Sequence, residues 1–186
     1  MRVLCLLLCF GMAVTSVVAG DCDKLDFVVQ WVDQSTSFAA NERIRLSYFL
    51  FNRTSDPIYV VPPTPIGLSF GDHRFGVRLE IFDPTSSEPA EFTRMAKCTM
   101  AGDPPDWSFE EEAQLYHRLG RNQLIGLRDT LDLAKIQLAP GVYSLRLVYA
   151  NQDPLDWTES ELEYFDASAP ACEVLSNSLR LEIRKE

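Results

Sequence analysis

The sequence predicts an antiparallel all-β domain, and two segments near the C-terminus carry most of that prediction. Leu138–Gly141 (Leu-Ala-Pro-Gly) has the composition of a turn, and Val142–Tyr149 after it is rich in β-branched and aromatic residues. Further on, Leu179, Leu181 and Ile183 alternate with polar residues. A period of two gives a strand one buried side and one solvent-facing side, so these segments predict a β-hairpin.

Five earlier segments also have the pattern of strands. The stretch Gln34–Glu42 between the first two is polar and turn-like, and the prolines of 62–65 must lie at a sheet edge or outside it, because they lack a backbone donor. We expect a bend at Gly126 in the fifth. Seven to nine strands separated by turn signals fit a β-sandwich. The five segments are 25–32, 44–50, 58–61, 75–82 and 122–133.

The first twenty residues, 1–20, have the features of a signal peptide. Arg2 supplies a positive start, an apolar stretch follows, and Val18-Ala19-Gly20 offers small residues for cleavage before Asp21. The alternative is an uncleaved anchor, but the apolar stretch falls short of the roughly 18–20 residues that a spanning helix needs. We therefore expect a periplasmic or extracellular protein whose residues 21–186 form a single domain, with no membrane insertion after cleavage.

The charge balance disfavours two classes of partner. The chain has 17 Lys and Arg against 27 Asp and Glu, a net charge of −10, and all the acidic residues lie in the expected mature part. Nucleic acids and anionic membranes attract Lys- and Arg-rich surfaces. We expect neither as a partner, and the simplest role for the excess charge is solubility.

Three cysteines remain after cleavage, and an oxidising compartment would pair two of them. We favour a disulfide between Cys98 and Cys172, because Cys22 lies close to the new N-terminus. Closing this loop would stabilise the fold by ~4 kcal/mol in the chain-entropy model. The other two pairings stay open.

Two acidic segments, 96–121 and 151–171, contain a short internal repeat. Asp-Pro-Pro-Asp-Trp-Ser at 103–108 matches Asp-Pro-Leu-Asp-Trp-Thr at 153–158, and each is followed by more acidic residues. Ser108 with Glu111, and Thr158 with Glu161, match the capping box that starts a helix. We therefore expect one or two short helices in long acidic loops, the first ending at Gly120.

Within this repeat, the paired tryptophans are the best candidates for a ligand-binding surface. Exposed tryptophans are enriched at interaction hot spots, although a loop tryptophan more often packs its loop against the domain. The predicted ligand-binding residues are Trp107, Trp157, Asp103, Asp106, Asp153 and Asp156.

An enzymatic alternative rests on the G-x-S-x-G pattern of Gly67–Gly71, which would make Ser69 the nucleophile of a serine hydrolase with His73 or His117 as base. The pattern needs a buried strand before the serine and a helix after it, whereas prolines precede it here and a strand follows. We therefore predict a non-enzymatic protein, with a glycine-flanked hairpin or loop at this position and His117 as an ordinary residue of the first short helix.

Calcium is a further alternative, because carboxylates gather at 21–23, 103–106 and 153–159, and flexible loops of this kind can supply oxygen ligands. No calcium-loop motif accompanies them, and neither histidine has zinc-site spacing, so we predict no metal and no cofactor. Separately, Asn52-Arg53-Thr54 is an N-glycosylation sequon that is as easily a turn.

Four stretches together resemble immunoglobulin-like β-sandwich domains of bacterial exported proteins. They are Ile-x-Leu-x-Tyr-x-Leu-x-Asn at 44–52, Pro-Ile-Tyr-Val at 57–60, Leu-x-Pro-Gly-x-Tyr-x-Leu at 138–145 and Ser-Asn-x-Leu-x-Leu-x-Ile at 176–183. The resemblance covers about half the mature chain and implies an adhesive, binding or inhibitory module without a cofactor. Residues 84–121 have no counterpart and form a possible insertion, and the antibody-type tyrosine two residues before Cys172 is absent.

We therefore expect an exported, non-enzymatic binding or structural module that recognises a protein or peptide through loops at one end of its sheets. The serine hydrolase and the calcium-stabilised domain remain the alternatives.

Overall fold

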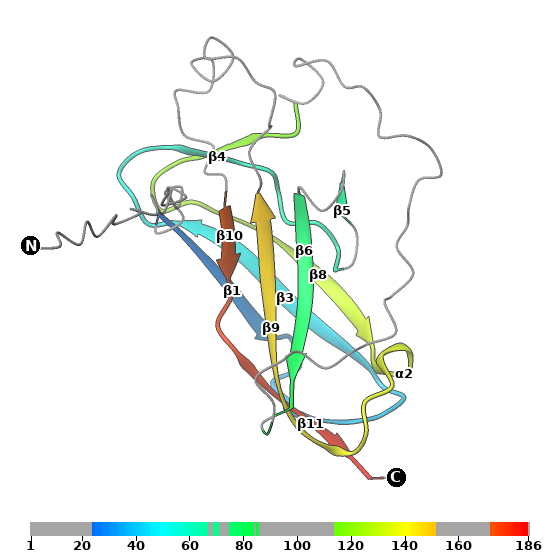
Figure 1. Ribbon diagram of the computed structural model, residues 1–186. Coiled ribbons are helices and arrows are strands. Elements are labelled where there is room, and N and C mark those ends of the chain that lie inside the picture. The colour runs from blue at the N-terminus through cyan, green and yellow to red at the C-terminus, as the bar shows by residue number, and fades with distance from the viewer. Residues whose placement is uncertain are drawn as a thin grey trace, which may run out of the picture.

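The computed structural model describes residues 24–66, 69–70, 75–83, 85, 114–151 and 172–185. These residues are mostly β-structure with a single short helix (Figure 1). The elements are β1 (Leu25–Trp31), β2 (Ser37–Ala39), β3 (Arg43–Asn52), β4 (Ile58–Val60), β5 (Ser69–Phe70), β6 (Phe75–Phe82), β7 (His117–Leu119), β8 (Leu124–Asp132), α2 (Leu133–Ile136), β9 (Gly141–Asn151), β10 (Cys172–Leu175) and β11 (Leu179–Arg184).

The strands form three sheets, and the prediction of an antiparallel all-β fold is confirmed at this level. One sheet has the order β1-β3-β8, a second has the order β2-β11-β9-β6-β5 with β10 also paired to β9, and β4 pairs with β7. Strand pairs within the sheets are antiparallel except β2 with β11, which run parallel. The predicted C-terminal pairing of β9 with β11 is present.

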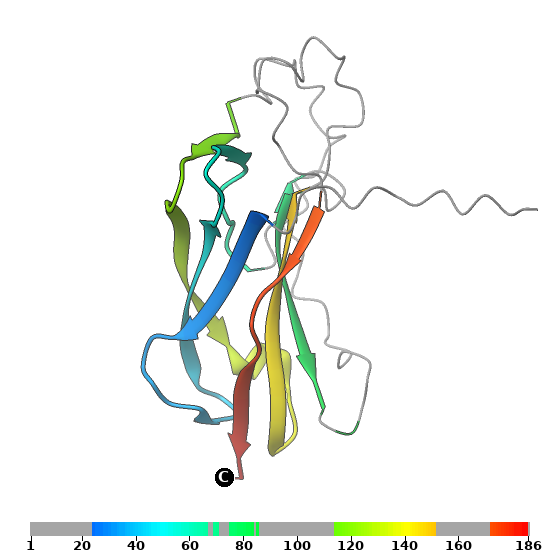
Figure 2. The same ribbon diagram turned by 90° about the vertical axis from the view of Figure 1, so that its left-hand side faces the viewer.

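The two larger sheets lie face to face with the core between them (Figure 2). Alternate residues of each strand point inward, as the period of two predicts, and Tyr48, Leu46, Leu147 and Tyr149 are fully buried. Burying apolar side chains from both sheets is the main force that holds them together. Further core residues are Leu25, Phe27, Val29, Ile44, Leu50, Val77, Ile81, Leu131, Leu145, Leu181 and Ile183.

The six-stranded sheet curls so that one side of the molecule is closed as a half-barrel. β2 follows β1 in the chain but pairs with β11 of the other sheet. Higher up, Phe27 forms an isolated parallel bridge with Ser176. The Asn177 side chain completes the junction, because its Nδ2 donates to the Val29 carbonyl (3.0 Å) and its Oδ1 accepts from the Val29 amide (2.9 Å).

The structure corrects four local predictions. Ser37–Ala39 is a strand, although its segment reads as a polar turn, because β11 supplies a pairing partner that is distant in sequence. His117 lies in β7 and not in a helix, since it pairs with Val60. β8 runs through Gly126 as one continuous strand. The only helix of the described residues is α2, capped by the Asp132 side chain, which accepts from the Ala134 amide at 3.2 Å.

Gly126 has a packing role in place of the expected bend. It pairs with Phe49 of β3, and a Cβ at this position would lie 2.4 Å from the Tyr48 carbonyl oxygen and 2.6 Å from the Phe49 Cβ. Only a residue without a side chain permits this close approach of the two strands. Among the described residues, no helix is long and apolar enough to cross a membrane.

Candidate functional site

The six predicted ligand-binding residues, Trp107, Trp157, Asp103, Asp106, Asp153 and Asp156, lie outside the described residues. The expected signal peptide, Cys22, Cys98, His73 and the two predicted capping boxes lie outside them as well. What the structure does describe is the framework to which the two tryptophan-bearing segments are joined.

Segment 152–171 leaves and re-enters the framework at one end, and the chain returns into β7 at that end, whereas β6, the strand before residues 96–121, ends at the opposite end of the sheet (Figure 1). Asn151, the last residue of β9, pairs directly with Cys172, the first residue of β10, so segment 152–171 leaves and re-enters at one point. Tyr116 precedes β7 and is buried. Burial raises the pKa of the Tyr149 hydroxyl of β9, and the nearby Tyr116 raises it further. β4, the end of β9 and the start of β10 all lie at the top of Figure 1.

A proline-rich segment, 61–66, is fixed between the two sheets just below this end. The Tyr48 hydroxyl of β3 donates to the Thr64 carbonyl at 2.7 Å, and the Tyr149 hydroxyl of β9 donates to the Val61 carbonyl at 2.6 Å. The Thr64 hydroxyl oxygen accepts from the Val77 amide at 3.2 Å. Prolines cannot donate backbone hydrogen bonds, so this segment offers carbonyls, and one tyrosine from each sheet satisfies them.

Asp129 fixes the far end of the same segment. Its Oδ2 accepts from the Ile66 amide at 2.7 Å and lies 3.4 Å from the Tyr48 hydroxyl, while its Oδ1 accepts from the Thr130 amide at 2.7 Å. The residue faces the core side of β8, opposite Leu46. A carboxylate in this place binds backbone donors that the core would otherwise leave unsatisfied.

Tyr48, Tyr149, Asp129 and segment 61–66 form what we call the tyrosine cluster, and its two tyrosine hydroxyls are structural donors. Burial raises the pKa of both the Tyr48 and the Tyr149 hydroxyl well above the usual tyrosine value, and the Asp129 carboxylate raises that of Tyr48 further. Both hydroxyls therefore stay protonated near neutral pH and act as donors, not as bases. The tyrosine cluster fixes segment 61–66 to both sheets, and its tyrosines do not serve as bases.

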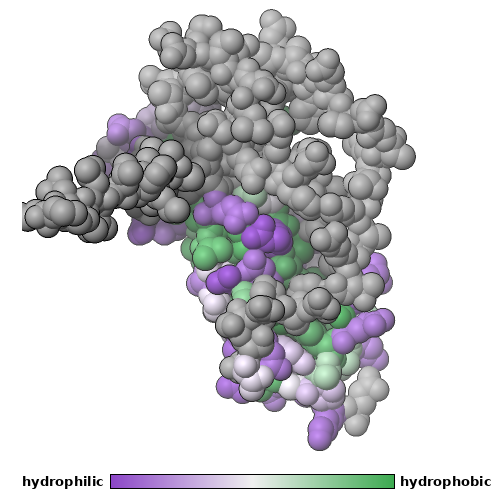
Figure 3. Space-filling model, in the orientation of Figure 1, coloured by the Kyte–Doolittle hydropathy of each residue, from purple (hydrophilic) through white to green (hydrophobic). Residues whose placement is uncertain are grey.

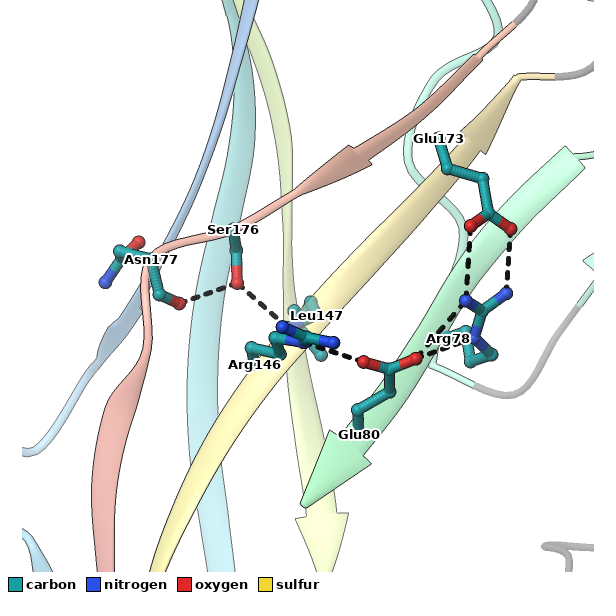
Figure 4. Close-up of polar contacts among 7 residues, drawn as sticks. All are labelled: Arg78, Glu80, Arg146, Leu147, Glu173, Ser176 and Asn177. Atoms are coloured by element: carbon teal, nitrogen blue, oxygen red, sulfur yellow. Dashed lines mark hydrogen bonds and ion pairs between the residues drawn. The ribbon is translucent and has the colours of Figure 1, made fainter. Parts of the chain in front are cut away.

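The outer face of the six-stranded sheet carries a row of charges (Figure 4). Glu80 of β6 lies between Arg146, at 2.7 Å, and Arg78, at 3.3 Å, and Arg78 also reaches across β9 to Glu173 at 3.0 Å. The Arg146 guanidinium lies 4.6 Å from the centre of the Phe82 ring. Figure 3 shows this face, where polar surface lies beside apolar surface. The row joins β6, β9 and β10 by paired charges.

A second polar contact shown in Figure 4 closes the junction between β10 and β11. The Ser176 hydroxyl oxygen accepts from the Leu147 amide at 2.8 Å, and the hydroxyl donates to the Asn177 carbonyl at 2.7 Å. Ser176 is nearly buried, so these contacts satisfy polar atoms that have little access to water.

The alternative sites can be placed in part. Ser69 lies in β5 and pairs with Gly76 of β6, which is the hairpin expected at the G-x-S-x-G pattern. His117 is exposed at the start of β7. Within the ranges that the structure describes, no group of three or more His, Cys, Asp or Glu residues is placed to hold a metal ion. The predicted calcium carboxylates lie outside those ranges.

The sequon asparagine has a structural role. Asn52 is fully buried, and its Nδ2 donates to the carbonyls of Asp56 (2.8 Å) and Leu119 (2.9 Å). Its Oδ1 accepts from the amide and the hydroxyl of Thr54, both at 2.8 Å. Every polar position of this side chain is used inside the protein, so the folded state has no room for a glycan there.

Comparisons with known proteins add no functional information. A scan against protein-family models finds no match, and a search of curated proteins finds no significant match. Among solved structures, a β-glucosidase from Erythrobacter marinus matches 86% of this chain at 12% identity with a TM-score of 0.38. The match spans 15% of that protein's length, and at this TM-score it carries no argument about fold or function.

Asp129 was not identified from the sequence as the residue that fixes segment 61–66, although the pattern of β8 contains a signal for it. The inward positions of β8 read Ile125, Leu127, Asp129 and Leu131, and a carboxylate among aliphatic residues marks a position with a polar partner. Nothing in the sequence indicates that this partner belongs to segment 61–66.

Proposed function

We propose that the protein is an exported, non-enzymatic binding module. It recognises a protein or peptide through the two acidic, tryptophan-bearing segments at one end of the framework. We further propose that the facing sheets are an immunoglobulin-like sandwich and that Cys98 pairs with Cys172. In this proposal the protein acts in the periplasm or outside the cell.

One observation carries the proposal: segment 152–171 leaves and re-enters the framework near Tyr149, and the chain that follows the other tryptophan-bearing segment returns near the same residue, at Tyr116. Segment 152–171 is anchored by the Asn151–Cys172 pair, and residues 114–116 lead from the other segment to Tyr116, which lies close to Tyr149. Long segments anchored on a rigid framework are the usual carriers of binding residues. Fixed anchors also lower the entropic cost of presenting two loops together.

A capture experiment tests this function. The mature protein is immobilised and exposed to the envelope and secreted proteins of the source organism, in parallel with the variant Trp107→Ala/Trp157→Ala. The expected result is a partner that the wild type retains and the variant loses. The matched control is Val142→Ala, since Val142 is 40% exposed at the start of β9, the opposite end of that strand from Asn151. Equal retention by the tryptophan variant would contradict the proposal.

A further inference from the structure

Three arginines of the described residues differ from all the others. Ten arginines fall within the described ranges, and seven of them form ion pairs with carboxylates. Arg118, Arg121 and Arg128 have no carboxylate partner in this part of the chain, and all three are exposed. They lie within eleven consecutive residues of β7, the following turn and β8.

These arginines belong to a framework whose charge is opposite to that of the whole chain. The described residues contain 13 Lys and Arg against 10 Asp and Glu, whereas the full chain contains 17 against 27. The described residues are therefore net positive in a protein of net charge −10. Three arginines without a carboxylate partner among the described residues give this part of the chain a local positive potential.

Apolar surface lies beside one of these arginines, Arg128, and within a few residues of Arg121 along the chain. Leu124, at the start of β8, is 62% exposed, the highest value among the exposed large hydrophobic residues of the described chain. Leu124, Gly126 and Arg128 alternate along β8 on the face that points away from the core. With Phe49 of β3 they line a shallow hollow of about 220 Å³. The hollow depends on glycine at position 126, because a Cβ there would collide with the β3 backbone.

We propose that this surface, made of Arg121, Leu124, Gly126, Arg128 and Phe49, binds an acidic polypeptide segment that carries a bulky apolar side chain. The apolar side chain lies in the hollow over Gly126 beside Leu124, and the flanking carboxylates pair with Arg121 and Arg128. None of the residues proposed above to bind a ligand belongs to this surface, so it stands or falls independently of the function proposed above.

The short range of electrostatic interactions in physiological salt favours a polypeptide over a nucleic acid as the partner. A short acidic segment interacts mainly with charges inside the Debye length of roughly 8–10 Å at physiological salt, where the arginines dominate. A long phosphate polymer extends past that distance and is repelled by the net charge of −10 of the whole chain. An exposed leucine beside a hollow also suits an apolar side chain better than a phosphate group.

Fluorescence anisotropy with a defined probe tests the proposal on the full mature chain. The probe is a labelled short peptide of Glu and Asp around one central Trp, with N-acetyl and C-amide ends. We expect binding that weakens with added NaCl and a loss of about tenfold in Arg121→Glu/Arg128→Glu, the size measured for close interfacial charge pairs. Leu124→Ala should weaken binding about fivefold through lost apolar contact.

Two matched controls separate this surface from general effects. Arg180→Glu/Arg184→Glu makes the same charge change at two exposed arginines of β11, and Leu175→Ala removes a leucine of β10 that is 52% exposed. Both should bind the probe like the wild type, and circular dichroism should show all four variants folded.

Several results would overturn the proposal. They are absence of probe binding to the wild type, equal losses in the control variants, and equal affinity for a single-stranded DNA oligonucleotide. Sedimentation of the protein alone tests whether a second copy of the chain occupies the surface. Self-association that is abolished by Arg121→Glu/Arg128→Glu would show that the occupant is a second copy and not a separate partner.

Discussion

Tyr48 and Tyr149 lie on opposing sheets, and both hydroxyls donate to carbonyls of one proline-rich segment, at Thr64 and Val61 respectively. The ring of Phe27 lies between them, with its centroid 6.1 Å from that of Tyr48 and 5.9 Å from that of Tyr149. The segment is therefore tied to both sheets near the end where segment 152–171 leaves and re-enters the framework. This double attachment links the two sheets through one segment.

Removing one hydroxyl of this pair should destabilise the protein. Tyr149→Phe leaves the Val61 carbonyl buried without its donor, which costs about 1–3 kcal/mol. Urea unfolding measures the difference. Tyr143→Phe is the control, because its hydroxyl donates to the Ala139 carbonyl near solvent and its loss should be within about 0.5 kcal/mol. Equal stability of both variants would refute a buried role for Tyr149.

The same tyrosines should make stability fall at alkaline pH. The folded state raises the pKa of Tyr149, so above the ordinary tyrosine pKa of about 10 the unfolded chain loses a proton that the folded protein keeps. Above that pH the free energy of unfolding should decrease by about 1.4 kcal/mol per pH unit because of Tyr149. Below pH ~9 the ionisation of Tyr149 should have no effect on stability. Unfolding curves of wild type and Tyr149→Phe between pH 8 and 12 give the comparison, and parallel pH profiles would contradict it.

Gly126 should not tolerate a side chain. In Gly126→Ala the new Cβ would lie 2.4 Å from the Tyr48 carbonyl oxygen, so β3 and β8 must move apart, at a cost of about 1–3 kcal/mol. In the control Gly141→Ala the nearest atom is 3.5 Å away, in the Tyr143 ring. Thermal unfolding should separate the two variants, and a Gly126→Ala protein as stable as Gly141→Ala would show that the strands are not in close contact.

Asn52 should be essential for stability and carry no glycan. Asn52→Ala removes four hydrogen bonds at a buried position and should cost about 3 kcal/mol. The control Asn41→Ala changes an exposed turn and should stay within about 0.5 kcal/mol. Mass spectrometry of protein secreted by a glycosylating host should show an unmodified Asn52 in the folded fraction, and a glycan on folded protein would contradict the buried position.

The local patterns of the chain predict the strands well, because a period of two depends only on neighbouring residues. β1, β3, β6, β8, β9 and β11 were all expected near their observed bounds. β2 was not, since its pairing with β11 joins residues far apart in the sequence. The roles of Asp129 and Asn52 were missed for the same reason: each bonds to a backbone atom that only the tertiary fold brings near.

The candidate site was predictable only as a set of segments. The repeat identifies Trp107 and Trp157 by residue type, and the hydrophobic pattern identifies the strands that flank them. No sequence pattern indicates that Tyr116 and Tyr149 approach each other. That proximity depends on the tertiary fold, which a local pattern does not contain.

Site-specific photocrosslinking tests the central claim of a loop-bearing binding end most directly. A photoreactive phenylalanine is placed singly at position 107, 157 or 142, where Val142 is 40% exposed at the start of β9, the opposite end of the strand from Asn151. Our account predicts one partner crosslinked from positions 107 and 157 and none from 142. Crosslinks to the same partner from position 142 alone would contradict it.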